Sequence, residues 1–163
     1  MTDYYVDASA LVKRYAEESG SSWVRQITDP SAQHTILLAE ITLAEVAAAL
    51  AAKHHAPGGI TQEQRDRILS RFLQDCAEHF VLLPVDRLVI DRAVELTQCY
   101  RLRGYDAVQR ATALVANDTI QTQNLSSPIF VAADGDLLTA AVAERLSVDN
   151  PLNHTDLDSQ PAQ

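Results

Sequence analysis

Four acidic residues stand at positions where a carboxylate is difficult to explain as an ordinary surface group. Asp7 and Asp134 each follow a short apolar run, whereas Glu45 and Asp106 belong to segments with the spacing of helices. Carboxylates that gather in one place repel one another unless protons or a cation compensate their charge. Because oxygen-only ligands suit Mg²⁺ or Mn²⁺, this set predicts metal-assisted hydrolysis of phosphodiester bonds.

The segments that must position these carboxylates alternate between short apolar strands and helices. Strands are expected at 3–6, 35–38, 80–84 and 129–133, with a candidate edge strand at 146–148. Helices are expected at 7–18, 19–27, 42–55, 61–79, 86–101, 106–117 and 134–145. This alternation predicts an α/β protein whose parallel sheet is covered on both faces. The carboxyl ends of parallel strands meet at one edge, where the acidic residues are expected to gather.

The chain of 163 residues is long enough for one domain with a substantial core. No repeat or linker divides it, so a single domain is expected over residues 1–150, followed by a polar, mobile tail over 151–163. No apolar stretch is long enough to cross a bilayer. A strand that begins at Tyr4 leaves no room for an export signal, which predicts a cytoplasmic protein.

The acidic residues also have purely structural interpretations. Asp7 could cap the helix that follows it. Asp106 could open a capping box with Gln109 and pair with Arg110 one turn later. Glu45 has the weakest structural alternative, because its helix is rich in alanine and apolar nearly all round. Burying a lone carboxylate costs several kcal/mol, so Glu45 is the strongest single indication of a site.

Asp134 and Asp136 compete for the fourth position in the acidic set. Asp134 follows its strand directly and is the better candidate, whereas Asp136 would support the site from nearby or face solvent. Ser9, two residues after Asp7, can reach the same strand end and orient a carboxylate or a water on the metal. Its structural alternative is a serine in the first turn of a helix.

The net charge of −9 argues against general nucleic-acid binding, which normally requires a basic surface. Divalent ions held by the acidic set would offset part of that charge. Five basic residues near the acidic positions are candidates for phosphate contacts, namely Lys13, Arg14, Arg101, Arg103 and Arg110. An acidic surface would equally suit a basic protein partner.

The segments around the acidic residues resemble the motifs of PIN-domain nucleases. The run YYVDASALVK at 4–13 resembles that family's first strand, which ends in Asp-x-Ser/Thr-Ala-Leu, and TLAEV at 42–46 resembles its helix-borne glutamate. The runs LRGYDAVQRATA at 102–113 and FVAADGDLL at 130–138 resemble the third and fourth motifs. Motif order and spacing look like the VapC-type toxin branch from residue 3 to about 150, and all four acidic positions are filled.

The resemblance implies a three-layer α/β/α fold with a short, mostly parallel sheet. It implies an endoribonuclease that uses one or two Mg²⁺ or Mn²⁺ ions, held by Asp7, Glu45, Asp106 and Asp134 as ligands or through water. The basic candidates would then contact RNA. The resemblance also implies a homodimer and an antitoxin protein partner, as expected for the toxin of a type II toxin–antitoxin pair.

Two other functions fit parts of the sequence. A phosphatase with Asp7 as nucleophile would suit a similar scaffold, but the haloacid-dehalogenase type needs an aspartate where this chain has Ser9. A catalytically idle PIN-like protein that binds a protein or peptide would suit the net charge. Against it stands the filled acidic set, because an idle protein gains nothing from four carboxylates that repel one another.

Overall fold

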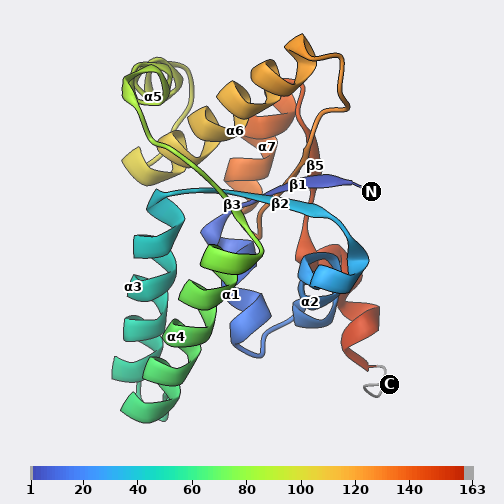
Figure 1. Cartoon of the computed structure of the whole chain (residues 1–163). Coiled ribbons are helices and arrows are strands. Elements are labelled where there is room, and N and C mark those ends of the chain that lie inside the picture. Colours follow the sequence, from blue (N-terminus) through green and yellow to red (C-terminus); the bar gives the residue numbers. More distant parts are fainter. Residues whose placement is uncertain (1, 160–163) are drawn as a thin grey trace.

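A computed structural model describes residues 2–159 of the chain. A single parallel sheet of five strands, in the order β3-β2-β1-β4-β5, forms its centre (Figure 1). The strands are β1 (Asp3–Val6), β2 (Thr35–Ala39), β3 (Val81–Leu83), β4 (Ile129–Val131) and β5 (Ser147–Asp149). Every pairing is parallel. The predicted α/β fold is confirmed, and the candidate edge strand at 146–148 corresponds to β5.

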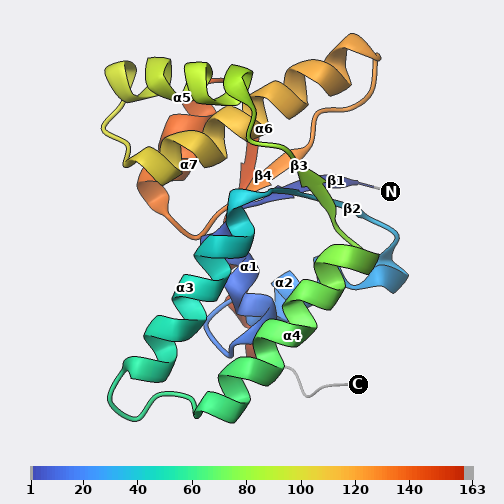
Figure 2. The same cartoon turned by 60° about the vertical axis from the view of Figure 1, so that its left-hand side comes forward.

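Helices cover both faces of the sheet (Figure 2). Four of them pack on one face, namely α1 (Ala8–Tyr15), α2 (Ser21–Thr28), α3 (Ile41–His55) and α4 (Gln62–Glu78). The other face carries α5 (Arg87–Cys99), α6 (Gly104–Thr122) and α7 (Gly135–Ala143). Two short 3-10 segments complete the order, η1 (Pro30–Ala32) and η2 (Pro151–Ser159). The result is the three-layer arrangement that the resemblance implies.

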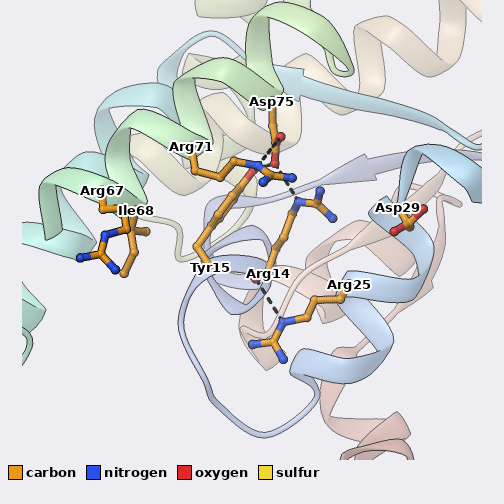
Figure 3. A pocket seen from close by; sticks show the side chains of 8 residues that line it. All are labelled: Arg14, Tyr15, Arg25, Asp29, Arg67, Ile68, Arg71 and Asp75. Atoms are coloured by element: carbon orange, nitrogen blue, oxygen red, sulfur yellow. Dashed lines mark hydrogen bonds and ion pairs between the residues drawn. The ribbon is translucent and has the colours of Figure 1, made fainter. Parts of the chain in front are cut away.

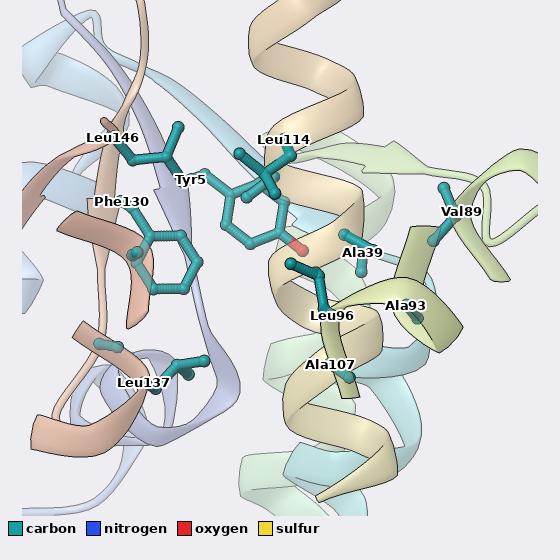
Figure 4. Close-up of a cluster of buried hydrophobic side chains, with 14 of the residues drawn as sticks. Tyr5, Ala39, Val89, Ala93, Leu96, Ala107, Leu114, Phe130, Leu137 and Leu146 are labelled. Carbon is teal, nitrogen blue, oxygen red and sulfur yellow. The ribbon is translucent and has the colours of Figure 1, made fainter. Parts of the chain in front are cut away.

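Two hydrophobic cores form because successive strand residues point to opposite faces. On the α5–α7 side, Tyr5 and Phe130 stack with ring centroids 5.5 Å apart (Figure 4). On the α1–α4 side, Val6 and Val131 are fully buried. Burial on both faces explains why the strands are apolar without alternation.

The register of the central strands fixes where the acidic residues leave the sheet. Val6 of β1 is paired with Val131 of β4, and the Asp7 amide donates to the carbonyl of Val131 at 2.9 Å. Tyr5 of β1 is paired with Leu37 of β2. Three adjacent strands therefore end together, so the helices and loops that follow them begin at one edge.

Two predicted helix starts are confirmed in atomic detail. Thr61 and Gln64 form a complete capping box at the start of α4. The Asp86 side chain accepts from the Val89 amide at 3.0 Å and caps α5. These bonds satisfy amide groups that have no partner within the helix.

The helix α6 differs from its predicted bounds at both ends. It begins at Gly104, so Asp106 lies within its first turn, where a negative charge favours the helix dipole. It continues through Thr122, which shortens the loop predicted at 119–127. Hydroxyl groups of Thr119 and Thr122 donate to the carbonyls of Val115 and Thr119, which explains how this polar stretch remains helical.

The segment after residue 150 differs from the mobile tail predicted by its composition. It folds as η2 and packs against α2, with the His154 ring stacked on Trp23 at 4.2 Å. The Asp158 carboxylate accepts from the amides of Gly20 and Ser22 and so caps α2. Gly20 has a φ of 84° and lies so close to Pro151 that a side chain would clash. Residues 160–163 of the predicted tail lie outside the described residues.

The seven α-helices include none that could span a bilayer; this holds for residues 2–159, which are those described.

Candidate functional site

Two of the four predicted carboxylates begin helices at the carboxyl edge of the sheet. Asp7 is the N-cap of α1 and accepts from the Ser9 amide at 2.9 Å, with only 6% of the residue exposed. Asp134 is the N-cap of α7 and accepts from the amides of Asp136 and Leu137. The capping interpretation of Asp7 is therefore correct, and Asp134 is a cap as well. Capping occupies one oxygen of each carboxylate and fixes its direction.

Glu45 enters the same region from α3, in a different way from the one predicted. The helix is not buried all round, because Ala44 and Ala48 are exposed and Glu45 itself is half-buried. Its carboxylate accepts a hydrogen bond from the side-chain amide of Gln109 on α6. The α3 and α6 helices, which cover opposite faces of the sheet, are thereby joined at the carboxylate.

Gln109 is the centre of a buried hydrogen-bond network that sequence analysis missed. Its side-chain nitrogen donates to Glu45 and to the Thr42 hydroxyl at 2.9 Å, while its oxygen accepts from the Tyr5 hydroxyl at 2.8 Å. Gln109 and Thr42 are fully buried. The predicted capping box of Asp106 with Gln109 is therefore wrong. The available signal was a glutamine within an alanine-rich helical segment, with Ala107 and Ala111 two residues before and after it.

Three of the four carboxyl groups, those of Asp7, Glu45 and Asp106, have raised pKa values, in part because of neighbouring acidic residues. Burial raises the pKa of Asp7 and the charge of Asp106 raises it further, against the hydrogen bonds from Ser9. Burial, Asp7 and Asp106 raise the pKa of Glu45 to about 7, although the Gln109 hydrogen bond opposes them. The pKa of Asp106 is raised by burial and by the charge of Asp134, and Arg103 partly offsets the shift. A cation placed among these groups would relieve the repulsion.

Ser9 connects the ends of the two central strands. Its backbone amide donates to Asp7, and its hydroxyl accepts from the Ala133 amide at 3.0 Å. The hydroxyl thus holds the turn before Asp134 against the start of α1. Asp136 is exposed in the first turn of α7, one residue beyond Gly135.

Two of the five basic candidates, Lys13 and Arg110, are buried in ion pairs, and a third, Arg14, is half-buried and paired with Asp75, so these three do not form a free rim around the acidic residues. The Lys13 ammonium pairs with Glu18 at 3.0 Å. The Arg14 guanidinium pairs with Asp75, and only 10% of the side chain is exposed. Arg110 is fully buried; its guanidinium lies over the Tyr100 ring and pairs with Glu144, the C-cap residue of α7, instead of Asp106.

The remaining two basic candidates lie in the connection between α5 and α6. Arg101 lies just before α6 and Arg103 is its N-cap residue; both are exposed. Arg103 is near enough to Asp106 for its charge to lower the pKa of that carboxyl group. They form a positive margin beside an acidic centre.

The donor chemistry of the centre fits a hard divalent cation. All four groups are carboxylates, and three of them have pKa values that a positive charge would lower. As the side chains stand, however, the described residues contain no group of three acidic, histidine or cysteine side chains that could hold an ion. Mg²⁺ keeps several waters and needs only one or two carboxylates from the protein, so the remaining groups could reach the ion through water.

Comparison with known proteins relates this arrangement to an existing family. The model of the PIN domain family matches residues 4–143. No match was found among curated proteins.

Several solved structures have a similar fold. The crystal structure of FitAcB from Neisseria gonorrhoeae is 16% identical, with 91% of this chain and 97% of that chain covered and a TM-score of 0.60. The structure of FitAB bound to an IR36 DNA fragment is also 16% identical, with coverage of 91% and 95% and a TM-score of 0.59. A toxin–antitoxin complex from Klebsiella pneumoniae is 23% identical, with coverage of 91% and 97% and a TM-score of 0.51. These similarities show the shared fold.

Proposed function

The chain belongs to the PIN domain family, and from this premise we propose that it is a metal-dependent endoribonuclease, the toxin of a type II toxin–antitoxin pair. PIN domains are generally nucleases. The observation that carries the proposal is the electrostatic coupling of four carboxylates at the carboxyl edge of the sheet. A cluster in which neighbouring charges raise one another's pKa is costly for the fold unless it serves a ligand.

The ligand is one or two Mg²⁺ or Mn²⁺ ions, held by Asp7, Glu45, Asp106 and Asp134. When bound, such ions supply Lewis-acid activation of water and neutralise charge on the phosphate in the transition state. The protein contributes the direction of the carboxylates. The Ser9 amide fixes Asp7, and the Gln109 side chain fixes Glu45. Asp136 supports the centre from the first turn of α7.

The substrate is an RNA strand that crosses the margin formed by Arg101 and Arg103. Both side chains are exposed; Arg103 acts on the pKa of Asp106, and Arg101 lines a surface pocket with Asp136. Arginines of this kind contact phosphates by charge with little preference for sequence. The protein acts in the cytoplasm, where its substrate is present.

The partner is an antitoxin protein, and the active form is a homodimer. Two of the solved structures with this fold are described as FitAB bound to DNA and as a toxin–antitoxin complex. Their similarity supports the proposal that this chain also binds a second protein. The net charge of −9 favours a partner segment that carries positive charge.

Cleavage of single-stranded RNA with Mn²⁺ and with excess EDTA tests the nuclease assignment. Cleavage is expected only with the metal, and Asp7→Asn is expected to abolish it. Asp86→Asn is the matched control, because Asp86 also caps a helix but lies outside the acidic set. Cleavage by Asp7→Asn at the rate of the control would exclude the proposed role of this residue.

A second function is favoured by one observation. Because no three acidic side chains within residues 2–159 stand ready to hold an ion, an idle PIN-like protein that binds a protein or peptide partner fits the present side-chain positions. Isothermal titration with Mn²⁺ separates the two functions. Heat of binding that disappears in Asp7→Asn supports the nuclease, whereas the absence of binding supports the idle protein.

A further inference from the structure

A pocket of about 440 Å³ opens between α1, α2 and α4 (Figure 3). Its lining includes four arginines from three different helices, namely Arg14, Arg25, Arg67 and Arg71. The whole chain has 13 lysines and arginines and a net charge of −9. Four arginines around one pocket are therefore a strong local departure from the acidic character of the protein.

A buried carboxylate anchors two of these arginines. Asp75 is 2% exposed; one of its oxygens accepts from Arg14 Nε at 3.0 Å and from the Tyr15 hydroxyl at 2.8 Å, and the other from Arg71 Nε at 3.0 Å. Although burial would raise the pKa of Asp75, the hydrogen bonds from Tyr15, Arg14 and Arg71 lower it. The carboxylate is thus charged and fully used as an acceptor.

One carboxylate shared by two guanidinium groups leaves a positive charge in excess. Figure 3 shows the Arg14 and Arg71 groups side by side against Asp75. Within residues 2–159, the terminal nitrogens of Arg71 donate to no protein group, and those of Arg14 donate only to Thr28. Since each arginine is held through Nε, its terminal nitrogens remain available to an anion.

The other two arginines have only weak competing partners. Arg25 donates through Nε to the Arg14 carbonyl and pairs with Glu17, while Arg67 pairs with Glu63. Glu17 and Glu63 are exposed, and such surface pairs contribute little and exchange readily. The opposing charge in the lining is Asp29, whose carboxylate already accepts from Ser31.

We propose that this arginine pocket binds a phosphate group. Guanidinium groups recognise oxyanions through paired hydrogen bonds. A phosphate has four oxygens in a tetrahedral arrangement, so it can accept from the adjacent Arg14 and Arg71 groups at the same time, while the Arg25 guanidinium adds positive charge from the Arg14 backbone side of the pocket (Figure 3). The phosphate comes from a bound RNA strand or from a free phosphate ion, and only the RNA source rests on the proposed nuclease function.

The pocket lies at the C-terminal end of α1, and Asp7 caps the N-terminal end of the same helix. Arg14 follows Asp7 by seven residues along α1, which is about 10 Å along the helix axis. A short oligonucleotide can cover such a distance. The pocket would then hold a phosphate away from the bond to be cleaved and contribute to binding without taking part in the chemistry.

Titration with inorganic phosphate, followed by NMR in the absence of metal, tests the pocket directly. The substitution is Arg71→Ala, since this side chain is 64% exposed and Asp75 keeps its hydrogen bonds from Arg14 and Tyr15. Arg87→Ala is a matched control, because Arg87 forms the same pair through Nε with an aspartate four residues later, on α5. Arg71→Ala is expected to weaken phosphate binding at least about tenfold, as for one lost charge-assisted hydrogen bond, and Arg87→Ala to leave it unchanged.

Binding of a short single-stranded RNA in EDTA identifies the source of the phosphate. If the strand enters the pocket, Arg71→Ala reduces the slope of log K against log salt by about 0.7, the value for one phosphate contact. An unchanged slope with intact phosphate binding assigns the pocket to free phosphate. The proposal is overturned if wild type does not bind phosphate, if both variants bind it alike, or if only an acidic peptide binds. Phosphate and RNA binding are measured without metal and do not require cleavage. A negative nuclease assay would therefore not change the conclusion drawn from these binding experiments.

Discussion

Gln109 on α6 donates a hydrogen bond to the carboxylate of Glu45 on α3, across 64 residues of sequence. The same glutamine accepts from the Tyr5 hydroxyl of the central strand. A side chain of the acidic centre is thus fixed to the hydrophobic core through two hydrogen bonds. The position of Glu45 depends on core packing as well as on its own helix.

Gln109→Leu is expected to destabilise the protein. The substitution keeps a similar size but leaves the Tyr5 and Thr42 hydroxyls without their partner in a buried region. Each unsatisfied buried group costs about 1–3 kcal/mol, so urea unfolding is expected to show a loss of that order or more. Gln98→Leu on exposed α5 surface is the control. Equal stability of the two variants would contradict the network.

The metal-free protein is expected to lose stability as pH rises from about 5 to about 8. The pKa of Glu45 rises from 4.5 to about 7 on folding. A raised pKa means that the stabilising contribution of the protonated group is complete below about pH 4.5 and is lost as pH passes through about 7. The pKa values of Asp7 and Asp106 are shifted in the same direction. Thermal melts in EDTA at several pH values measure this loss of stability. Glu45→Gln is expected to make the melting temperature depend less on pH. A variant whose melting temperature falls with pH as steeply as that of wild type would rule out Glu45 as the cause.

Mn²⁺ is expected to stabilise the wild-type protein and to reverse this pH trend. A ligand that binds only the native state adds about 2.7 kcal/mol at a hundredfold excess over its Kd. Asp7→Asn is expected to melt at a higher temperature than wild type without metal, because it removes a buried charge that repels Asp106. It is also expected to lose most of the gain from Mn²⁺. A wild-type protein that does not respond to millimolar Mn²⁺ in thermal shift assays would argue against a metal site.

Replacing Arg101 and Arg103 together by alanine is expected to weaken RNA binding while leaving Mn²⁺ binding unchanged. Both side chains are exposed beside the acidic centre. Loss of two phosphate contacts to a single strand reduces the slope of log K against log salt by about 1.4. Fluorescence anisotropy at several salt concentrations measures it, with Arg87→Ala as a control on a distant exposed surface. A slope equal to that of the control would assign the two arginines another role.

The order of strands and helices was predictable because its signals are local. Apolar runs of four to six residues, helical spacing and capping residues such as Asp86 depend on neighbours in sequence. The placement of Asp7 and Asp134 at one edge also followed, since parallel strands end together. The bounds of α6 were less accurate, because a capping pattern at Asp106 is equally compatible with a helix that begins two residues earlier.

The partners of buried polar side chains were not predictable, because they come from distant elements. Arg110 is typical of a surface arginine by sequence, yet it lies between the Tyr100 ring and Glu144. Nothing near Gln109 in the sequence indicates Tyr5 or Thr42 as partners. The polar composition after residue 150 likewise conceals two specific contacts, the Trp23–His154 stack and the Asp158 cap.

The packing of η2 on α2 makes the protein vulnerable at a place far from its acidic centre. The amides that begin α2 depend on Asp158, because the Gly20 cap position has no side chain of its own to accept from them. A protease that cuts between β5 and η2 would release η2 from α2 and expose Trp23. Helix α2 packs on α1, the helix that Asp7 begins. A single cut near Asn150 would therefore loosen the support of Asp7 while sparing every acidic residue of the set.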